Sequence, residues 1–264
     1  MSSATVPILR DKHHSAASEF TPENLLREAR RQKRLAKVSV PPICVLDPDG
    51  DIVRYLRSTG RARLDENWAC YHSDLYRFEH EGQEFGIVGC AVGASYAVLI
   101  AEQMFASGCE LLISITSSGQ ITSLGPPPYF ILIEKALRDE GTSYHYLPPA
   151  DYAEADPQLI EAIWCNLSFL GERVERGATW TTDAPFRETT AAIEAARARG
   201  LLAVEMEASA LYAFARSRNR PLVCFAHVTN QMAVEEGDFE KGEENGALAA
   251  VELIGAIGEG LRAS

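Results

Sequence analysis

The 264-residue sequence lacks the features that mark several special classes of protein. No apolar run is long enough to span a bilayer, and no stretch has the form of a signal-peptide core. No cluster of His, Cys and carboxylate residues has the spacing of metal ligands, so neither a metal nor an organic cofactor is implied. Positive charge is also scarce, with 25 Lys and Arg against 37 Asp and Glu, a net charge of -12. We therefore expect neither a nucleic acid nor a membrane as the main partner.

The cysteines show no paired spacing and lie mostly in apolar runs. Disulfide frameworks and zinc sites both need regular spacings, so the pattern favours neither. We expect reduced, buried thiols in a cytoplasmic protein. The six positions are Cys44, Cys70, Cys90, Cys109, Cys165 and Cys224.

Composition and length describe an ordinary globular domain preceded by an extension. Apolar residues make up 46% and charged residues 23%, and 264 residues approach the upper limit for a single core. Residues 1–40 form an N-terminal extension, in which Thr21-Pro22 predicts the start of a basic helix reaching about Leu35. A solvated face or a subunit contact explains its arginines better than an anionic ligand does. Residues 41–264 form the main domain.

The stretch Leu201–Tyr212 carries the clearest chemistry in the chain. Four apolar residues, Leu201 to Val204, predict a buried strand, and small residues after Glu207 open a helix. Glu205 and Glu207 therefore lie at the carboxyl end of a strand, where α/β sheets usually bind ligands. Burying a carboxylate is costly unless it gains a partner. The alternative is that both acids only favour the positive end of the helix.

The octapeptide V-E-M-E-A-S-A-L, residues 204–211, resembles the ribose-binding signature of the nucleoside phosphorylase and uridine phosphorylase family. That family also contains the hydrolytic methylthioadenosine nucleosidases. Other segments resemble it in the same order, from about Pro41 to the C-terminus. The resemblance implies an α/β fold, a single three-layer domain with a central mixed twisted sheet flanked by helices. It also implies a small-molecule nucleoside as partner, inorganic phosphate as a candidate co-substrate, and a homo-oligomer.

By this resemblance Glu207 is the first candidate for ribose binding and catalysis. A carboxylate can accept two hydrogen bonds from vicinal 2′ and 3′ hydroxyls. It also places negative charge near the oxocarbenium character that develops as the base departs. Met206 offers an apolar surface beneath the sugar, and Glu205 is the third candidate.

Two further segments resemble the family's phosphate-binding loops. Ser117, Ser118 and Gly119 follow an apolar strand and could bind anion, sugar or base through neutral hydrogen bonds. Gly93 stands where a strand meets a helix, which exposes backbone N–H groups to a ligand, although a tight turn without a ligand is the simpler reading. The resemblance assigns Gly93 and Ser117 to the phosphate site.

The base-binding candidates follow two later strands. Phe186 could stack on a planar base, with Arg187 as its polar neighbour. Asn230 and Gln231 follow the strand predicted at Pro221–Val228. Asn230 is a candidate catalytic residue because its amide can hydrogen-bond a leaving base, although it cannot protonate one at neutral pH.

Two family arginines that hold phosphate are missing. Gly50 and Ser114 stand at their positions, and Leu46 replaces a glycine of the same loop. Three hypotheses follow. Family resemblance favours phosphorolysis of a nucleoside by a pentosyltransferase, which we place first. The missing arginines favour a hydrolytic nucleosidase or a non-catalytic nucleoside-binding protein.

Overall fold

The structure, a computed structural model, describes residues 6–167, 171–232 and 238–262. Within these ranges the helices are α1 (Pro22–Lys33), α2 (Asp51–Ser58), α3 (Ala94–Ala106), α4 (Pro157–Leu167), α5 (Thr190–Ala198), α6 (Ala208–Arg218) and α7 (Ala247–Arg262). The strands are β1 (Ile43–Asp47), β2 (Ala62–Leu64), β3 (Tyr76–His80), β4 (Gln83–Gly89), β5 (Leu111–Gln120), β6 (Tyr129–Asp139), β7 (Tyr152–Glu154), β8 (Val174–Thr182), β9 (Ala203–Glu205) and β10 (Leu222–Asn230). Short 3-10 turns lie at Pro7–Leu9, Ser143–His145, Pro185–Arg187 and Glu243–Gly246.

The strands form one mixed sheet that partly closes on itself. β10 pairs with β5 in parallel and with β6 antiparallel. β6 continues through β8 and β9, and β9 returns to β5, which completes a ring of five strands. From β5 the sheet extends outward through β1, β4, β3 and β2. The long β5 belongs to both parts, so residues at its carboxyl end face strands from distant parts of the chain.

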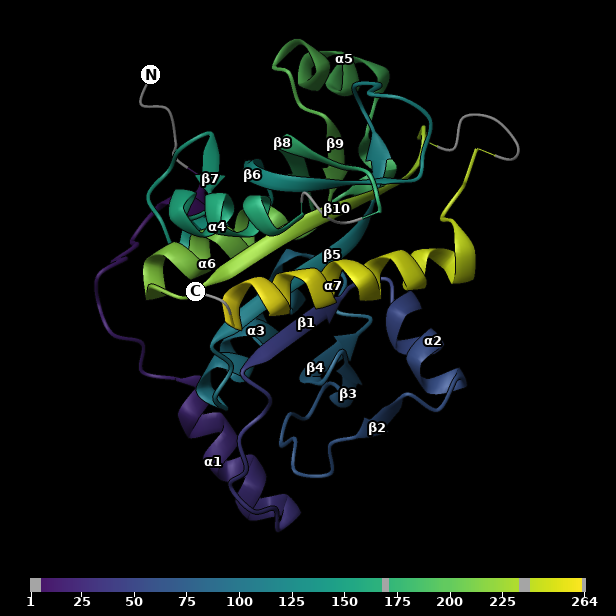
Figure 1. The fold of residues 1–264 in the computed structure, drawn as a ribbon. Helices are drawn as coiled ribbons and strands as arrows, with labels where there is room; N and C mark the ends of the chain where they lie inside the picture. Colours follow the sequence, from purple (N-terminus) through teal and green to yellow (C-terminus); the bar gives the residue numbers. More distant parts are fainter. Residues whose placement is uncertain (1–5, 168–170, 233–237, 263–264) are drawn as a thin grey trace.

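Helices cover both faces of the sheet (Figure 1). α3 packs against α6 and α1, whereas α7 packs against α4 and α2. In Figure 1, α7 crosses in front of β1 and β5, and α5 stands apart from the other helices. The α/β fold with a mixed sheet between helices, expected from the resemblance, is therefore confirmed.

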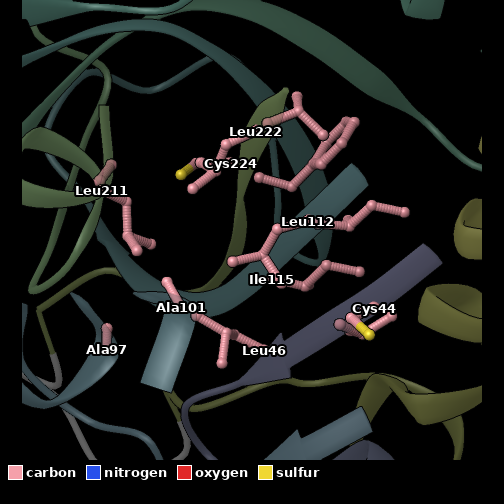
Figure 2. Close-up of a cluster of buried hydrophobic side chains, with 14 of the residues drawn as sticks. Cys44, Leu46, Ala97, Ala101, Leu112, Ile115, Leu211, Leu222 and Cys224 are labelled. Atoms are coloured by element: carbon pink, nitrogen blue, oxygen red, sulfur yellow. The ribbon is translucent and has the colours of Figure 1, made fainter. Parts of the chain in front are cut away.

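The main core fills the space between the sheet and its helices. Leu46 of β1, Ile115 of β5 and Ala101 of α3 belong to this core and are among the buried side chains drawn in Figure 2. These side chains are at most 4% exposed. Small residues on α3 and α6 allow the helices to approach the strands closely, which explains why both helices are rich in alanine. Burial on both faces also explains the apolar runs that open β1, β5 and β10.

The N-terminal helix packs on the body of the protein. Thr21 caps α1 by accepting a hydrogen bond from the Asn24 N–H at 3.3 Å, as the Thr-Pro pair predicts. Leu26 and Ala29 are fully buried against Ala69. The basic residues of α1 lie mainly on its other side, which agrees with a solvated face.

The thiols are only partly as predicted. Four cysteines are buried, but Cys90 and Cys165 are exposed, because Cys90 lies just after β4 and Cys165 on the outer side of α4. Throughout the described ranges, every helix is too short or too polar to cross a bilayer.

Tyr212 joins α6 to two strands of the ring. Its hydroxyl donates to the Ile133 carbonyl at 2.6 Å and accepts from the Cys224 N–H at 3.0 Å, and its side chain is 1% exposed. We predict that Tyr212→Phe lowers the free energy of unfolding by about 1–3 kcal/mol, because both backbone groups lose a buried partner. Urea titration monitored by circular dichroism measures the change.

The matched control is Tyr71→Phe. The Tyr71 hydroxyl donates to Gln32 at 2.8 Å on the surface, where water can replace it. We expect a change within about 0.5 kcal/mol. Equal effects of the two substitutions would contradict the role given to Tyr212.

Candidate active site

Several of the predicted residues meet at the carboxyl end of β5. There Gly119 pairs with Val204 of β9 on one side and with Asn230 of β10 on the other. β1 and β4 end at the same edge, because they run parallel to β5. The sheet thus brings together residues that are up to about 180 positions apart, at the edge where α/β sheets usually bind ligands.

Glu205 ends β9 with its carboxylate saturated by donors from the protein. One oxygen accepts from the hydroxyls of Thr179 at 3.0 Å and Thr181 at 2.5 Å. The other accepts from the backbone N–H groups of Glu207 and Ala208, both at 2.7 Å. These are the first free N–H groups of α6, so Glu205 fixes the start of that helix. Burial raises the pKa of Glu205, and its donors oppose that shift. This placement gives Glu205 a structural role in place of direct contact with ribose.

Glu207 is the residue just before α6, and one of its two carboxylate oxygens has no hydrogen-bond donor among the described residues. Its side chain is 1% exposed, and Oε1 accepts from the Gly93 N–H at 2.7 Å. Oε2 is buried, and no group of the described residues donates to it. Burial, together with the neighbouring carboxylates of Glu205 and Asp49, raises the pKa of Glu207 to about 8, although the Gly93 N–H and the nearby Thr116 hydroxyl act to lower it. Glu207 therefore has one carboxylate oxygen available to a ligand.

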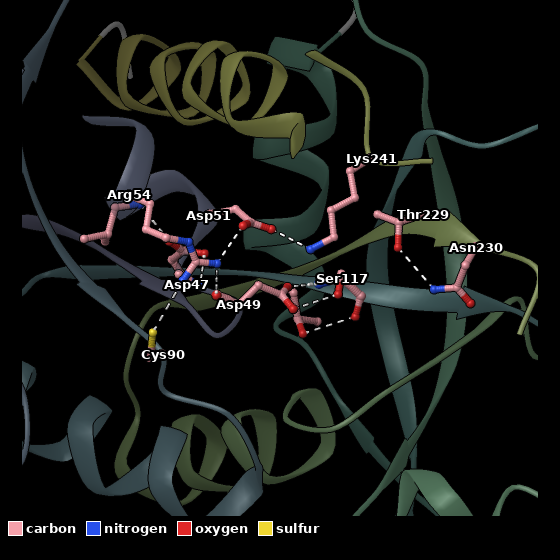
Figure 3. A network of polar contacts seen from close by, with 12 residues as sticks. Asp47, Asp49, Asp51, Arg54, Cys90, Ser117, Thr229, Asn230 and Lys241 are labelled. Atoms are coloured by element: carbon pink, nitrogen blue, oxygen red, sulfur yellow. Dashed lines mark hydrogen bonds and ion pairs between the residues drawn. The ribbon is translucent and has the colours of Figure 1, made fainter. Parts of the chain in front are cut away.

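Ser117 is already bound to a carboxylate of its own chain. Its backbone N–H donates to Asp49 Oδ2 at 2.7 Å, and its hydroxyl donates to Asp49 Oδ1 at 2.8 Å (Figure 3). Asp49 belongs to the D-P-D-G turn between β1 and α2. The backbone N–H of Gly93 is likewise taken by Glu207. Both positions assigned to phosphate thus donate to acidic side chains.

Asn230 is occupied within its own turn. Its oxygen accepts from the Met232 N–H at 2.9 Å, and its nitrogen lies 3.2 Å from Thr229 Oγ1 and 3.5 Å from the Ser118 carbonyl. These bonds hold the end of β10 against the end of β5. A Cβ at Gly119 would lie 2.6 Å from Met232 Sδ, so the end of the Met232 side chain packs directly over this glycine. The hydroxyl of Ser118 is buried and, among the described residues, has no hydrogen-bond partner.

A family model described as "Phosphorylase superfamily" matches residues 42–259. The chain belongs to the phosphorylase superfamily. The match covers every strand of the sheet and the helices from α2 to all but the last residues of α7, and it leaves α1 outside.

Relatives of known structure or curated name agree with this assignment. A uridine phosphorylase from Thermococcus kodakarensis is 25% identical over 238 residues, with 80% of this chain and 84% of that protein covered. The crystal structure of a uridine phosphorylase from Vibrio fischeri ES114 matches with a TM-score of 0.69, 21% identity, and coverage of 86% and 95%. The crystal structure of a purine nucleoside phosphorylase from Toxoplasma gondii, solved with immucillin-H, matches with a TM-score of 0.71 and 16% identity. The match covers 86% of this chain and 92% of that chain. At these identities the two solved structures support the fold alone.

The residues predicted to bind the base are exposed and lie apart from Glu207 within one chain. The 3-10 turn Pro185–Arg187 directs the ring of Phe186 outward, where it is 99% exposed, and Arg187 is exposed beside it. Gln231 is also exposed, and its backbone N–H donates to Asp238. Met206 is half-buried between the two glutamates. Stacking of Phe186 on a base thus has no geometric support inside a single chain.

Sequence reasoning missed the acidic turn that faces Ser117. Asp47 is 2% exposed, and burial raises its pKa to about 7, although backbone N–H groups of Val53 and Gly50 bind it. His227 on β10 faces the same recess, and burial lowers its pKa to about 4, so the imidazole is neutral. The resemblance compared Leu46 and Gly50 with a phosphate-binding loop of the family and gave Asp49 no role. Its approach to Ser117 depends on strand pairing that local patterns do not reveal.

The pKa of Glu207 makes stability depend on pH. Because its folded-state pKa, about 8, lies above its ordinary value of 4.5, the folded protein holds the proton more tightly than the unfolded chain does. The stabilisation is complete below about pH 4.5 and is lost as the pH rises toward 8. Compared with Glu207→Gln, we predict that the wild type loses up to about 1.4 kcal/mol per pH unit in this window.

Urea unfolding of both proteins at several pH values from 5 to 8 measures this difference. Asp47, Glu205 and His227 titrate in both proteins, so the comparison isolates Glu207. Parallel stability curves would contradict the shift.

Proposed function

We propose that this chain binds a nucleoside through its pentose and cleaves the N-glycosidic bond. The observation that carries the proposal is the unpartnered Oε2 of Glu207, buried at the ligand edge of the sheet. A buried carboxylate oxygen without a donor is costly. Two vicinal hydroxyls would complete its coordination, one on Oε2 and one beside the Gly93 N–H on Oε1.

The chemistry of Glu207 suits the reaction as well as the binding. Hydrogen bonds to the carboxylate favour its charged form, so a bound pentose lowers the raised pKa of Glu207. The resulting negative charge lies near the anomeric carbon, which becomes positive as the base leaves. Met206 provides the apolar surface under the sugar, and the unpartnered hydroxyl of Ser118 is a second hydrogen-bonding group for the substrate.

The remaining candidates take supporting positions in this proposal. Glu205 holds the backbone N–H groups of Glu207 and Ala208, and Asn230 holds that of Met232. Both side chains therefore position the site without contacting the substrate. Phe186 and Arg187 would reach a base only across a subunit contact, for which the exposed ring of Phe186 is the supporting observation.

Phosphate is the acceptor suggested by family membership and by the names of the uridine and purine nucleoside phosphorylases that the chain resembles. The second candidate is water. The observation that favours water is that Ser117 and Gly93, the two positions assigned to phosphate, donate to Asp49 and Glu207. A protein that binds nucleosides without cleaving them would keep the same use of Glu207.

Glu207→Gln should lower kcat/KM for base release by about 100-fold or more, because a charge-assisted pair of hydrogen bonds to the pentose is lost. The measurement is the release of free base from a panel of purine and pyrimidine nucleosides, with and without inorganic phosphate, followed by chromatography.

The control is Glu194→Gln, which removes an exposed carboxylate on α5. Its kinetics should match those of the wild type. Unchanged kinetics in Glu207→Gln would sink the site assignment. If the wild type binds nucleosides tightly but releases no base with or without phosphate, the chain is a nucleoside-binding protein and the proposed cleavage is wrong.

A further inference from the structure

The Asp49–Ser117 pair forms a complete anion site whose occupant belongs to the chain. The N–H and O–H of Ser117 both point to one carboxylate, with one donor on each oxygen, at 2.7 and 2.8 Å. Backbone N–H and hydroxyl donors in this arrangement are the groups that bind oxyanions such as phosphate. Because Asp49 is covalently part of the loop, an external anion must displace it to use these donors.

The nearby cations are committed to other acceptors. Lys241 pairs with Asp51 Oδ2 at 2.5 Å. Arg54 binds Asp51 Oδ1 at 2.6 Å and the Asp49 carbonyl oxygen at 2.7 Å. Figure 3 shows both side chains directed to Asp51 and the carboxylate of Asp49 directed to Ser117. An incoming phosphate dianion would thus meet the negative charge of Asp49 with the nearest positive charges already paired.

The space beside the pair fits water better than phosphate. The recess lined by Asp49, Ser117 and His227 has a volume of about 20 Å³. A water molecule needs about 10–15 Å³ by this measure, so the recess holds about one. The recess is polar on several sides, and the neutral imidazole of His227 adds no positive charge to it.

The recess also lies close to the proposed pentose site. The charge of Asp49 contributes to the raised pKa of Glu207, which places the two carboxylates in one electrostatic neighbourhood. β9 pairs antiparallel with the end of β5, so Glu207, just after β9, lies alongside the part of β5 that carries Ser117 and Ser118. A molecule held in the recess is therefore near a pentose bound to Glu207.

We propose that Asp49 determines the acceptor: its carboxylate occupies the anion site on Ser117, excludes phosphate and leaves water to take the pentosyl group. This inference rests on the proposed function. In the reaction the water oxygen bonds to the anomeric carbon, and the bond from that carbon to the base nitrogen breaks. The electron pair of that bond leaves with the base. One proton of the water stays on the new sugar hydroxyl and the other passes to the base, so the products are free pentose and free base.

The test replaces Asp49 by Ser, which removes the charge and opens the space, and by Asn, which removes the charge and keeps the size. Base release is measured with and without inorganic phosphate, and ³¹P NMR identifies pentose 1-phosphate. The wild type should release base at the same rate with and without phosphate and form free pentose. Asp49→Ser should form pentose 1-phosphate and show at least a tenfold gain in the share of turnover that depends on phosphate. Asp49→Asn should show a smaller gain.

Asp51→Asn is the matched control. It removes one negative charge from the same turn, but Asp51 contacts Lys241 and Arg54 and leaves Ser117 untouched. It frees Lys241 and Arg54, but Asp49 still occupies the Ser117 donors, so its gain in phosphate use should be smaller than that of Asp49→Ser. An equal gain in Asp51→Asn would overturn the inference, because net charge rather than the Ser117 contact would then exclude phosphate. Thermal melting checks that every variant is folded.

A second readout separates this inference from the proposed function. Calorimetry with inorganic phosphate alone should detect at least tenfold tighter binding to Asp49→Ser than to the wild type. If no nucleoside is cleaved, the proposed function fails, and phosphate binding still decides the role of Asp49. If the wild type cleaves nucleosides only with phosphate and forms pentose 1-phosphate, the proposed function stands and the role of Asp49 is overturned. Equal phosphate affinity of wild type and Asp49→Ser also overturns it.

Discussion

The buried carboxylate of Glu205 is the interaction on which the candidate site depends. Its four hydrogen bonds tie the end of β8 to the first turn of α6, through Thr179 and Thr181 on one oxygen and two backbone N–H groups on the other. A fully paired buried carboxylate stabilises its surroundings, whereas a half-paired one is costly. Because Glu205 is satisfied, the backbone at Glu207 is held in a single position and its side chain is directed to Gly93.

The two glutamates thus differ in how their carboxylates are bound, although only one residue separates them. Glu205 has no oxygen left for a ligand, and Glu207 has one. Their mutual repulsion and their burial keep the pKa of Glu207 near 8. That arrangement reduces the stability of the empty site and is relieved by donors on a ligand, as is common where proteins trade stability for function. The same logic explains why Ser118 keeps a buried hydroxyl without a partner in the described chain.

The turn after β1 gives the opposite case, in which the chain supplies its own ligand. Relatives named phosphorylases share this fold, yet here Asp49 binds Ser117, and Gly50 and Ser114 stand where the family resemblance expects arginine. Asp51 then takes up the nearby Lys241 and Arg54. Fold alone therefore does not decide the acceptor, and in our proposal it depends on a few side chains at one edge of the sheet.

Much of the fold could be predicted from the sequence, because it depends on local patterns. The apolar runs that open β1, β5 and β10, the cap at Thr21 and the alanine-rich α6 each follow from burial or capping over a few residues. The apolar run at the start of β6 is less decisive, because a short apolar run by itself suits a strand or a helix. The position of Glu205 and Glu207 at the carboxyl end of a buried strand also followed from the apolar run before them.

Tertiary structure alone decided what each site residue does. Glu205 and Glu207 are alike in sequence, and strand β8 makes them different by supplying two threonine hydroxyls to one of them. Asp49 reaches Ser117 only because β1 and β5 are neighbours, and Phe186 is exposed because the short turn that carries it faces outward. Sequence fixes which groups are present within a few residues of each other. Which donors reach which carboxylate depends on strand pairing between residues far apart in the chain, and that is where the chemistry of this protein is set.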